Sequence, residues 1–303
     1  MGIFLIALTY FTFVFLILMV TAKLIKIARM PEHLRWELAP IPHEKSKNKY
    51  SGFYLEGYEK RHKKRRKSLV AVVIYMAKEM LLFKGVWKNN RTLWPFSFSM
   101  HIGIYLVILS ILLYIVNALL MITGTPASAL DALESIAAVI ALAGYILGCF
   151  GAIGLIFKRS LDAGLRYFGS LAIYFRLIFL AAVFISGIIA WFNVSNFALT
   201  MSLFTRNLLT LNTAITIATP LAVHLVLLLL FLIYLPLTDM THFIIKYFTY
   251  HAVRWNDEPL NTKMEAGLNE LQSQTSSWSA PHIPSGKTWA EIAAEKTPDE
   301  KAS

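Results

Sequence analysis

Three of the eight histidines lie inside long apolar runs, where an ionisable side chain is costly to place. These three are His101, His224 and His242. Ionisable residues at membrane depth commonly serve cofactors or ion pathways, so these side chains are the first candidates for chemistry. The other five lie in polar segments, where solvated or partner-contacting side chains are expected: His33, His43, His62, His251 and His282.

The spacing of the three histidines places them at two depths. His224 and His242 are 18 residues apart, which is five turns of one helix and a rise of about 27 Å, apart from any rotation introduced by Pro236. That distance excludes a shared metal ion. His101 lies early in one run and His242 late in another, so both are expected at one depth. Two neutral imidazoles converging from neighbouring helices are the ligands of a low-spin, six-coordinate haem iron. The alternative is a pair of structural histidines that hydrogen-bond within the bundle.

The role of His224 stays open at this stage. It ligates a second haem, binds a haem whose sixth ligand is unusual or absent, or borders a quinol pocket. Met121 lies near the outer end of the run that holds His101 and is a conceivable axial ligand, although packing explains a methionine there more simply.

Five apolar runs are long enough to cross a bilayer. Apolar residues make up 56% of the 303 residues, and the mean hydropathy is +0.56, which is too hydrophobic for a soluble globule. A crossing takes about 20 apolar residues, and backbone in lipid must satisfy its own hydrogen bonds, so the sequence predicts an all-α integral membrane bundle of five transmembrane helices. A further segment, 68–83, carries Lys78 and Glu79 and predicts an interfacial or re-entrant helix, with a sixth span as the alternative. The expected spans are 3–27, 94–122, 133–157, 171–191 and 213–247.

Basic residues predict the orientation of the bundle in the cytoplasmic (inner) membrane. The cluster at 60–67 is of a kind that is rarely translocated, so its loop is expected in the cytoplasm and the N-terminus outside. Five crossings then place Lys158, Arg159, Arg166 and the C-terminal tail on the cytoplasmic side. The formal charge of +11 is therefore a topology signal, and no nucleic-acid partner is expected. The predicted parts are a first span (1–27), a basic loop with the interfacial helix (28–93), a four-helix core (94–250) and an extended, partner-binding tail (251–303).

For several other residues of the spans, both a structural and a functional role are considered. Asp239, one turn from His242, orients that histidine, carries protons, or lies at the helix end among lipid head groups. Arg176 pairs with a haem propionate or extends to the interface. Cys149 is the single cysteine, so an iron–sulfur cluster must belong to a partner. Close helix packing is the favoured role for four glycines of the third run: Gly144, Gly148, Gly151 and Gly154.

The motifs around these histidines resemble a known family, the gamma subunit of respiratory nitrate reductase and its relatives in heterodisulfide-reductase-like complexes. The stretch Ser99-Met100-His101-Ile102-Gly103-Ile104 is similar to the haem-ligand motif on that family's second span. Two histidines 18 residues apart, with Leu235-Pro236-Leu237-Thr238-Asp239-Met240-Thr241 between them, are similar to its last span. The resemblance covers 94–247 and implies five spans with the N-terminus outside. It also implies that His101 and His242 hold a haem b on the cytoplasmic side, and that His224 serves an outer haem.

One departure from the family concerns the second haem. The family has another histidine ten residues after the first one on its second span, and this chain has Ile111 there. The basic loop and the tail are more similar to the membrane cytochrome b of redox complexes in sulfate- and sulfite-metabolising microbes. That resemblance implies a cytoplasmic iron–sulfur partner, similar to the catalytic subunit of heterodisulfide reductase, and an outer multihaem cytochrome c.

The expected function is therefore electron transfer within an oxidoreductase complex. Electrons would pass between a quinone pool, such as menaquinone, or the outer cytochrome and the cytoplasmic iron–sulfur partner. The competing class is a haem-free membrane anchor or a transporter. Transporters commonly show interrupted helices at matching positions in two halves, whereas only the fifth run here is interrupted by proline.

Overall fold

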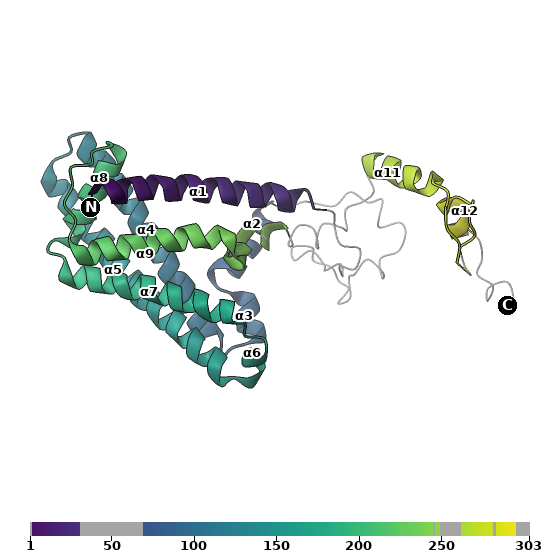
Figure 1. Ribbon diagram of the computed structural model, residues 1–303, viewed down its shortest axis with the longest axis horizontal. Coiled ribbons are helices and arrows are strands. Elements are labelled where there is room, and N and C mark those ends of the chain that lie inside the picture. The colour runs from purple at the N-terminus through teal and green to yellow at the C-terminus, as the bar shows by residue number, and fades with distance from the viewer. Residues whose placement is uncertain (1, 31–68, 245, 249–261, 281–282, 295–303) are drawn as a thin grey trace. The chain divides into compact units, whose positions relative to one another are not determined.

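The chain divides into two units in a computed structural model, shown in Figure 1. The first unit comprises 1–32 and 70–249, and the second comprises 33–69 and 250–303. The basic cluster at 60–67 and the five histidines of the polar segments lie outside the described residues. The described residues are 2–30, 69–244, 246–248, 262–280 and 283–294.

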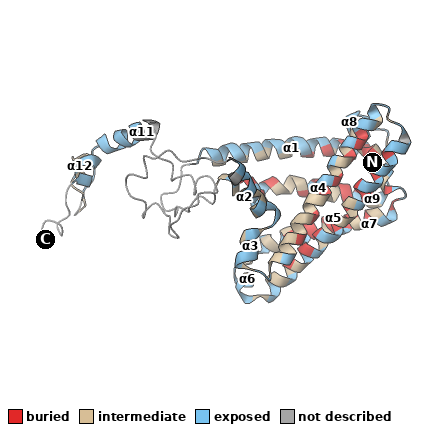
Figure 2. Ribbon diagram, turned by 180° about the vertical axis from the view of Figure 1, so that it is seen from behind, coloured by how far each residue is buried: buried red, intermediate tan, exposed pale blue. Residues whose placement is uncertain are grey.

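Five helices of the first unit are long and apolar enough to cross a bilayer, which confirms the predicted all-α membrane bundle. Figure 2 shows buried residues along α4, α5 and α7, whereas most of α1 is exposed. Phe11, Leu18, Phe157 and Phe192 are all more than half exposed, as apolar side chains can be when lipid surrounds them. The helices are α1 (Gly2–Ala28), α4 (Trp94–Ile122), α5 (Ala127–Leu161), α7 (Leu171–Asn193) and α9 (Thr219–Tyr234).

Successive long helices of this unit alternate in direction and so define two ends. The His101 end holds the N-terminus of α4 and the C-terminus of α5. The Gly124 end holds the connection between these helices, where Gly124 adopts a left-handed conformation with φ 82°. Helix α8 (Phe197–Leu209) also lies at the Gly124 end (Figure 1) and packs on α4 and α5. It has no counterpart among the predicted elements.

The prediction of one continuous fifth span over 213–247 is wrong. Helix α9 ends at Tyr234, because Pro236 has no N–H to continue the helical ladder. Two 3₁₀ turns follow, and the chain becomes α-helical again at His242. His224 and His242 therefore do not lie on one face of one helix. The two turns are η3 (Leu235–Leu237) and η4 (Asp239–Thr241).

Glycines hold α4 and α5 at backbone contact. A Cβ atom on Gly103 would lie 2.4 Å from the backbone nitrogen of Gly148, and one on Gly151 would lie 2.3 Å from the backbone nitrogen of Met100. Gly148 also receives the ring of Phe184 from α7, whose Cζ would lie 2.3 Å from a Cβ there. Backbone atoms cannot rotate aside as side chains do. The close-packing role expected for the glycines of α5 is thus confirmed.

The segment before α4 forms two short helices, α2 (Leu69–Leu81) and α3 (Lys84–Asn89). Helix α2 has 13 residues, too few to cross the bilayer, in agreement with the predicted additional helix. Two hydrogen bonds fasten α2 and the residue after it to α4. The Tyr105 hydroxyl donates to the Met80 carbonyl at 3.1 Å, and the Trp94 indole N–H donates to the carbonyl of Leu82, which directly follows α2, at 3.0 Å.

The second unit has local order of its own in its described residues. Thr275 and Thr288 form an antiparallel bridge, and Thr288 caps the helix that follows. The Glu291 carboxylate accepts the backbone N–H of Thr288 at 2.8 Å, while the Thr288 hydroxyl oxygen accepts the Glu291 N–H at 3.2 Å. Hydrogen bonds from Thr288 hold the pKa of Glu291 below its ordinary value. The helices are α11 (Thr262–Ser273) and α12 (Trp289–Ala294).

A methyl group at Gly151 should destabilise the bundle, because it would meet the backbone of α4. We expect Gly151→Ala to lose about 1–3 kcal/mol of unfolding free energy and to lower the thermal unfolding midpoint in detergent, followed by circular dichroism. Gly164→Ala is the control, since a Cβ there makes an ordinary 3.4 Å contact with Asp162 Oδ1. Equal midpoints for Gly151→Ala and the wild type would contradict the packing account.

Candidate functional site

The rings of His101 and His242 lie close together at the His101 end. Their ring centroids are 6.1 Å apart and their planes make an angle of 77°. His101 lies in the second turn of α4, and His242 directly follows η4. The structure therefore brings together two residues, 141 positions apart in the chain, that the sequence predicted to share a depth.

A hydrogen bond fixes the tautomer of His101. Its Nδ1 lies 2.7 Å from the Ser97 carbonyl oxygen. A carbonyl can only accept, so Nδ1 carries the proton and the lone pair is on Nε2. Metal-binding imidazoles are commonly oriented in this way by a backbone carbonyl. The ring of Phe83, between α2 and α3, packs beside His101 with centroids 4.5 Å apart, and Phe83 adopts a left-handed conformation, φ 51°, that bulky residues rarely take.

The separation of the two rings suits one metal ion between them. An imidazole nitrogen lies about 2 Å from a first-row transition metal that it coordinates, and the ring centroid lies roughly 1 Å further away. Two imidazoles on opposite sides of one ion therefore have centroids roughly 6 Å apart. The 6.1 Å between His101 and His242 matches this requirement.

The electrostatic environment keeps His242 in the form that binds metals. Burial, followed by the nearby Lys246 ammonium, lowers the pKa of His242 below its ordinary value, so the ring is neutral at neutral pH. Lys246 in turn lies 3.7 Å from the Glu79 carboxylate of α2. That carboxylate also accepts the backbone N–H of Gly85 at 3.2 Å. Helix α2 is thereby tied to the segment that carries His242.

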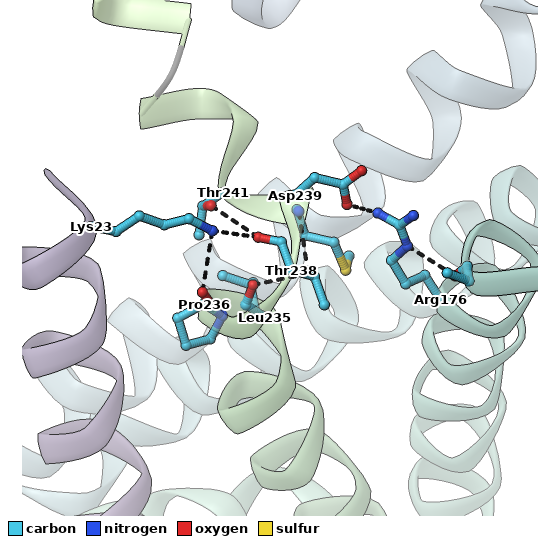
Figure 3. A network of polar contacts seen from close by, with 9 residues as sticks. Lys23, Arg176, Leu235, Pro236, Thr238, Asp239 and Thr241 are labelled. Carbon is cyan, nitrogen blue, oxygen red and sulfur yellow. Dashed lines mark hydrogen bonds and ion pairs between the residues drawn. The ribbon is translucent and has the colours of Figure 1, made fainter. Parts of the chain in front are cut away.

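Lys23 of α1 donates hydrogen bonds to two carbonyls at the interruption of the fifth span (Figure 3). Its ammonium donates to the Thr238 carbonyl at 2.5 Å and to the Pro236 carbonyl at 3.3 Å. The Thr238 hydroxyl closes the turn by donating to the Leu235 carbonyl at 3.0 Å and accepting the Met240 N–H at 3.3 Å. A cation at the end of a helix also opposes the partial negative charge of the carbonyls there. Lys23 thus stabilises the turn that leads to His242.

A second cation holds the other side of the same turn. Arg176 of α7 forms an ion pair with Asp239, and its Nε donates to the Ala172 carbonyl at 2.9 Å. Figure 3 shows Lys23 and Arg176 reaching the turn from opposite sides. The side chain of Asp239 is exposed and that of Arg176 is largely buried. The two residues therefore pair with each other, which neither of their predicted roles included.

His224 occupies a different environment, in the interior near the Gly124 end. It is 1% exposed, and both ring nitrogens have protein partners. The Ser186 hydroxyl donates to the Val183 carbonyl at 2.8 Å, so its oxygen accepts the Nδ1–H of His224 at 3.0 Å. The other nitrogen, Nε2, then accepts the Tyr145 hydroxyl at 3.0 Å. In this arrangement no ring lone pair is left for iron, and the partners of His224 do not include Met121.

Sequence reasoning missed the residues that orient these histidines. The sequence shows Lys23 as a cation inside an apolar run. The carbonyls that Lys23 binds become available only because the fifth span is interrupted. Tyr145 and Ser186 carry no such signal, because tyrosine and serine are common in membrane helices as packing residues. Their role depends on which helices adjoin α9.

The chain matches no protein-family model, no curated protein and no solved structure at a significant level.

Removing the Lys23 ammonium should loosen the turn before His242. We expect Lys23→Met to accelerate backbone hydrogen–deuterium exchange in 235–244. The Pro236 carbonyl then loses the Lys23 hydrogen bond, and the Thr238 carbonyl keeps only the Thr241 hydroxyl, in a setting with little water. Lys26→Met is the matched control, since Lys26 is exposed one turn further along α1. Equal exchange in this segment for Lys23→Met and the wild type would show that Lys23 does not hold the turn.

Proposed function

We propose that this protein is a membrane cytochrome b that carries electrons for an oxidoreductase complex. The observation that supports the proposal is the closeness of the His101 and His242 rings, whose centroids are 6.1 Å apart, a separation at which the two imidazoles would hold one haem iron between them. The bound haem b would supply reversible one-electron transfer. The residues of this chain would set its position and its surroundings.

Each of the two ligands has a support that suits this role. His101 is oriented by the Ser97 carbonyl, which holds the proton on Nδ1 and presents Nε2. His242 is held by the turn between Lys23 and Arg176. Other side chains of these segments are apolar and pack against the hydrophobic core of the bundle, and an apolar environment influences the potential of a haem. They include Met100, Ile104, Leu235 and Met240.

A second haem does not fit His224 as the ring is bonded here. An axial ligand must offer a nitrogen lone pair, and the Nε2 lone pair of His224 accepts the Tyr145 hydroxyl. We therefore propose a stoichiometry of one haem per chain. Ile111, at the position where the resembling family has a further histidine, agrees with it.

The proposed electron route joins a quinone pool, such as menaquinone, or an outer multihaem cytochrome c to a cytoplasmic iron–sulfur subunit like that of heterodisulfide reductase. Support comes from the resemblance of 94–247 to nitrate reductase gamma subunits and from Cys149, which alone cannot build a cluster. The proposed orientation in the cytoplasmic membrane has the N-terminus outside and the C-terminus in the cytoplasm. It follows from the basic cluster at 60–67.

A pyridine haemochrome assay on the purified full-length protein tests this proposal. We expect one haem b per chain and a b-type α band in the reduced visible spectrum. His101→Ala and His242→Ala should each abolish that band, because one axial imidazole alone does not hold a low-spin haem. Tyr105→Phe is the control, since it lies one turn from His101 on α4 and loses only the hydroxyl that bonds Met80.

Two results would decide against the proposal. A protein without a b-type band, purified from cells that supply haem, would favour the haem-free anchor or the transporter. A band of full intensity in His101→Ala would show that this pair does not hold the iron. Two haems per chain would revise the stoichiometry and return His224 to the ligand set.

A further inference from the structure

The Gly124 end contains buried polar side chains that the proposed haem site does not use. Glu134 of α5 is 5% exposed although it lies within a predicted membrane span. Tyr114 and Asn117 of α4 and Ser202 of α8 are at most 1% exposed. A carboxyl group and three other polar groups buried together, where lipid surrounds the bundle, are costly unless they serve a purpose.

Three of these groups have polar atoms without a protein partner. They are the Tyr114 hydroxyl, the Asn117 Oδ1 atom and the Ser202 hydroxyl. The Asn117 amide is fixed from its other side, where Nδ2 donates to the Leu130 carbonyl at 3.1 Å. Buried polar atoms are nearly always satisfied, and when protein does not provide the partner, bound water does. We therefore expect ordered water among these three side chains.

Glu134 belongs to the same cluster. The Ser202 hydroxyl lies beside the Glu134 carboxyl group, although outside ordinary hydrogen-bond geometry. The Tyr114 hydroxyl is within electrostatic range of the same group. The ion pairs of the described residues do not include Glu134. An ionised carboxylate without a cation in a low-dielectric interior is strongly disfavoured, so Glu134 rests as the neutral acid. A neutral acid beside bound water can release and recover a proton.

The cluster continues inward to His224 through two tyrosines. Helical side chains lean toward the N-terminus of their own helix. Because α4 and α5 are antiparallel, the side chains of Tyr114 and Tyr145 lean toward each other, and their hydroxyls are within electrostatic range. Tyr145 already donates to Nε2 of His224 at 3.0 Å. Polar groups thus follow one another from Glu134 to His224.

We propose that these side chains and the water among them form a proton path between Glu134 and His224. The O–H bond of the Glu134 acid breaks and its proton passes to water. The proton then moves to the Tyr114 hydroxyl, to the Tyr145 hydroxyl and to Nε2 of His224, and each hydroxyl on the way accepts one proton and releases one. Glu134 is left as a carboxylate and His224 becomes an imidazolium, whose Nδ1–H stays on Ser186. The reverse sequence restores both groups.

The aqueous exit of this path is at the first turns of α5. Asp131 lies one turn before Glu134, is exposed, and is close enough to interact with it electrostatically. Arg206 lies one turn after Ser202 on α8 and is also exposed. The Asp131 carboxylate can accept a proton from water outside the bundle and release it again, whereas the Arg206 guanidinium stays charged. The path would therefore let a buried imidazole exchange its proton with one side of the membrane, whether or not the chain binds haem.

Infrared spectroscopy of the full chain in lipid nanodiscs tests the buried acid. At neutral pH the wild type should show a carboxylic acid C=O stretching band that shifts in D₂O. Glu134→Gln should lose this band and Asp131→Asn should keep it. Glu134→Asp retains a carboxyl group, so it should keep an acid band at a shifted position, and it serves as the test variant if Glu134→Gln perturbs the fold. Absence of the band from the wild type, or its persistence in Glu134→Gln, would overturn the proposal.

Proton exchange at the His224 ring tests the connection. In ¹⁵N-histidine-labelled protein in lipid, the Nε2 resonance of His224 is assigned by its loss in His224→Gln. Exchange of the Tyr145 hydroxyl proton, which is hydrogen-bonded to Nε2, is followed in D₂O by NMR through the isotope shift of that nitrogen. Tyr114→Phe should slow this exchange by roughly tenfold or more, because a break in the chain of hydroxyls leaves only a hydrocarbon-lined gap. Tyr105→Phe, on the same helix, should leave it unchanged. Equal exchange rates in Tyr114→Phe and the wild type would show that no such path exists.

Discussion

Every backbone carbonyl within a bilayer needs a hydrogen-bond partner, and the interruption of the last span is where this requirement is hardest to meet. Pro236 ends the α-helical ladder, and the chain then passes through two 3₁₀ turns. The ammonium of Lys23 donates hydrogen bonds to the Pro236 and Thr238 carbonyls, so a residue of the first helix provides hydrogen-bond donors for the last span. Because the turn is closed in this way, His242 is directed toward α4. The position of the proposed iron site depends on that closure.

The other elements are consistent with this one constraint. Glycine contacts bring α4 and α5 together at backbone distance, which fixes the helix that carries His101. The ion pair between Arg176 and Asp239 joins α7 to the opposite side of the turn. Helix α2 is tied to α4 by Tyr105 and to the segment after the turn through Glu79. Contacts from α1, α2, α5 and α7 therefore hold the two histidines at their separation.

Hydropathy alone was enough to predict the five long apolar helices. A helix must have a minimum apolar length to cross lipid, and short apolar segments do not reach that length. The pairing of His101 with His242 followed from their places in two antiparallel runs, and the structure does bring them together. The prediction that His224 and His242 lie five turns apart on one helix was wrong. A proline in a helical pattern indicates an interruption, but it does not predict the conformation of the residues that follow. Helix α8 and the bonds of His224 to Tyr145 and Ser186 depend on which helices become neighbours, and a single sequence holds no signal for that.

In the proposed site, His101 and His242 would together hold one haem iron, and the angle between their rings offers a direct test. The axial ligands set the electronic state of a haem iron. The two planes make an angle of 77°, and ferric iron between nearly perpendicular imidazoles gives a single, strongly shifted low-field line in its EPR spectrum. The oxidised full-length protein should show this line, and His242→Ala should lack it. A rhombic three-line spectrum would contradict the ring geometry, and the absence of any low-spin ferric signal would contradict the claim itself.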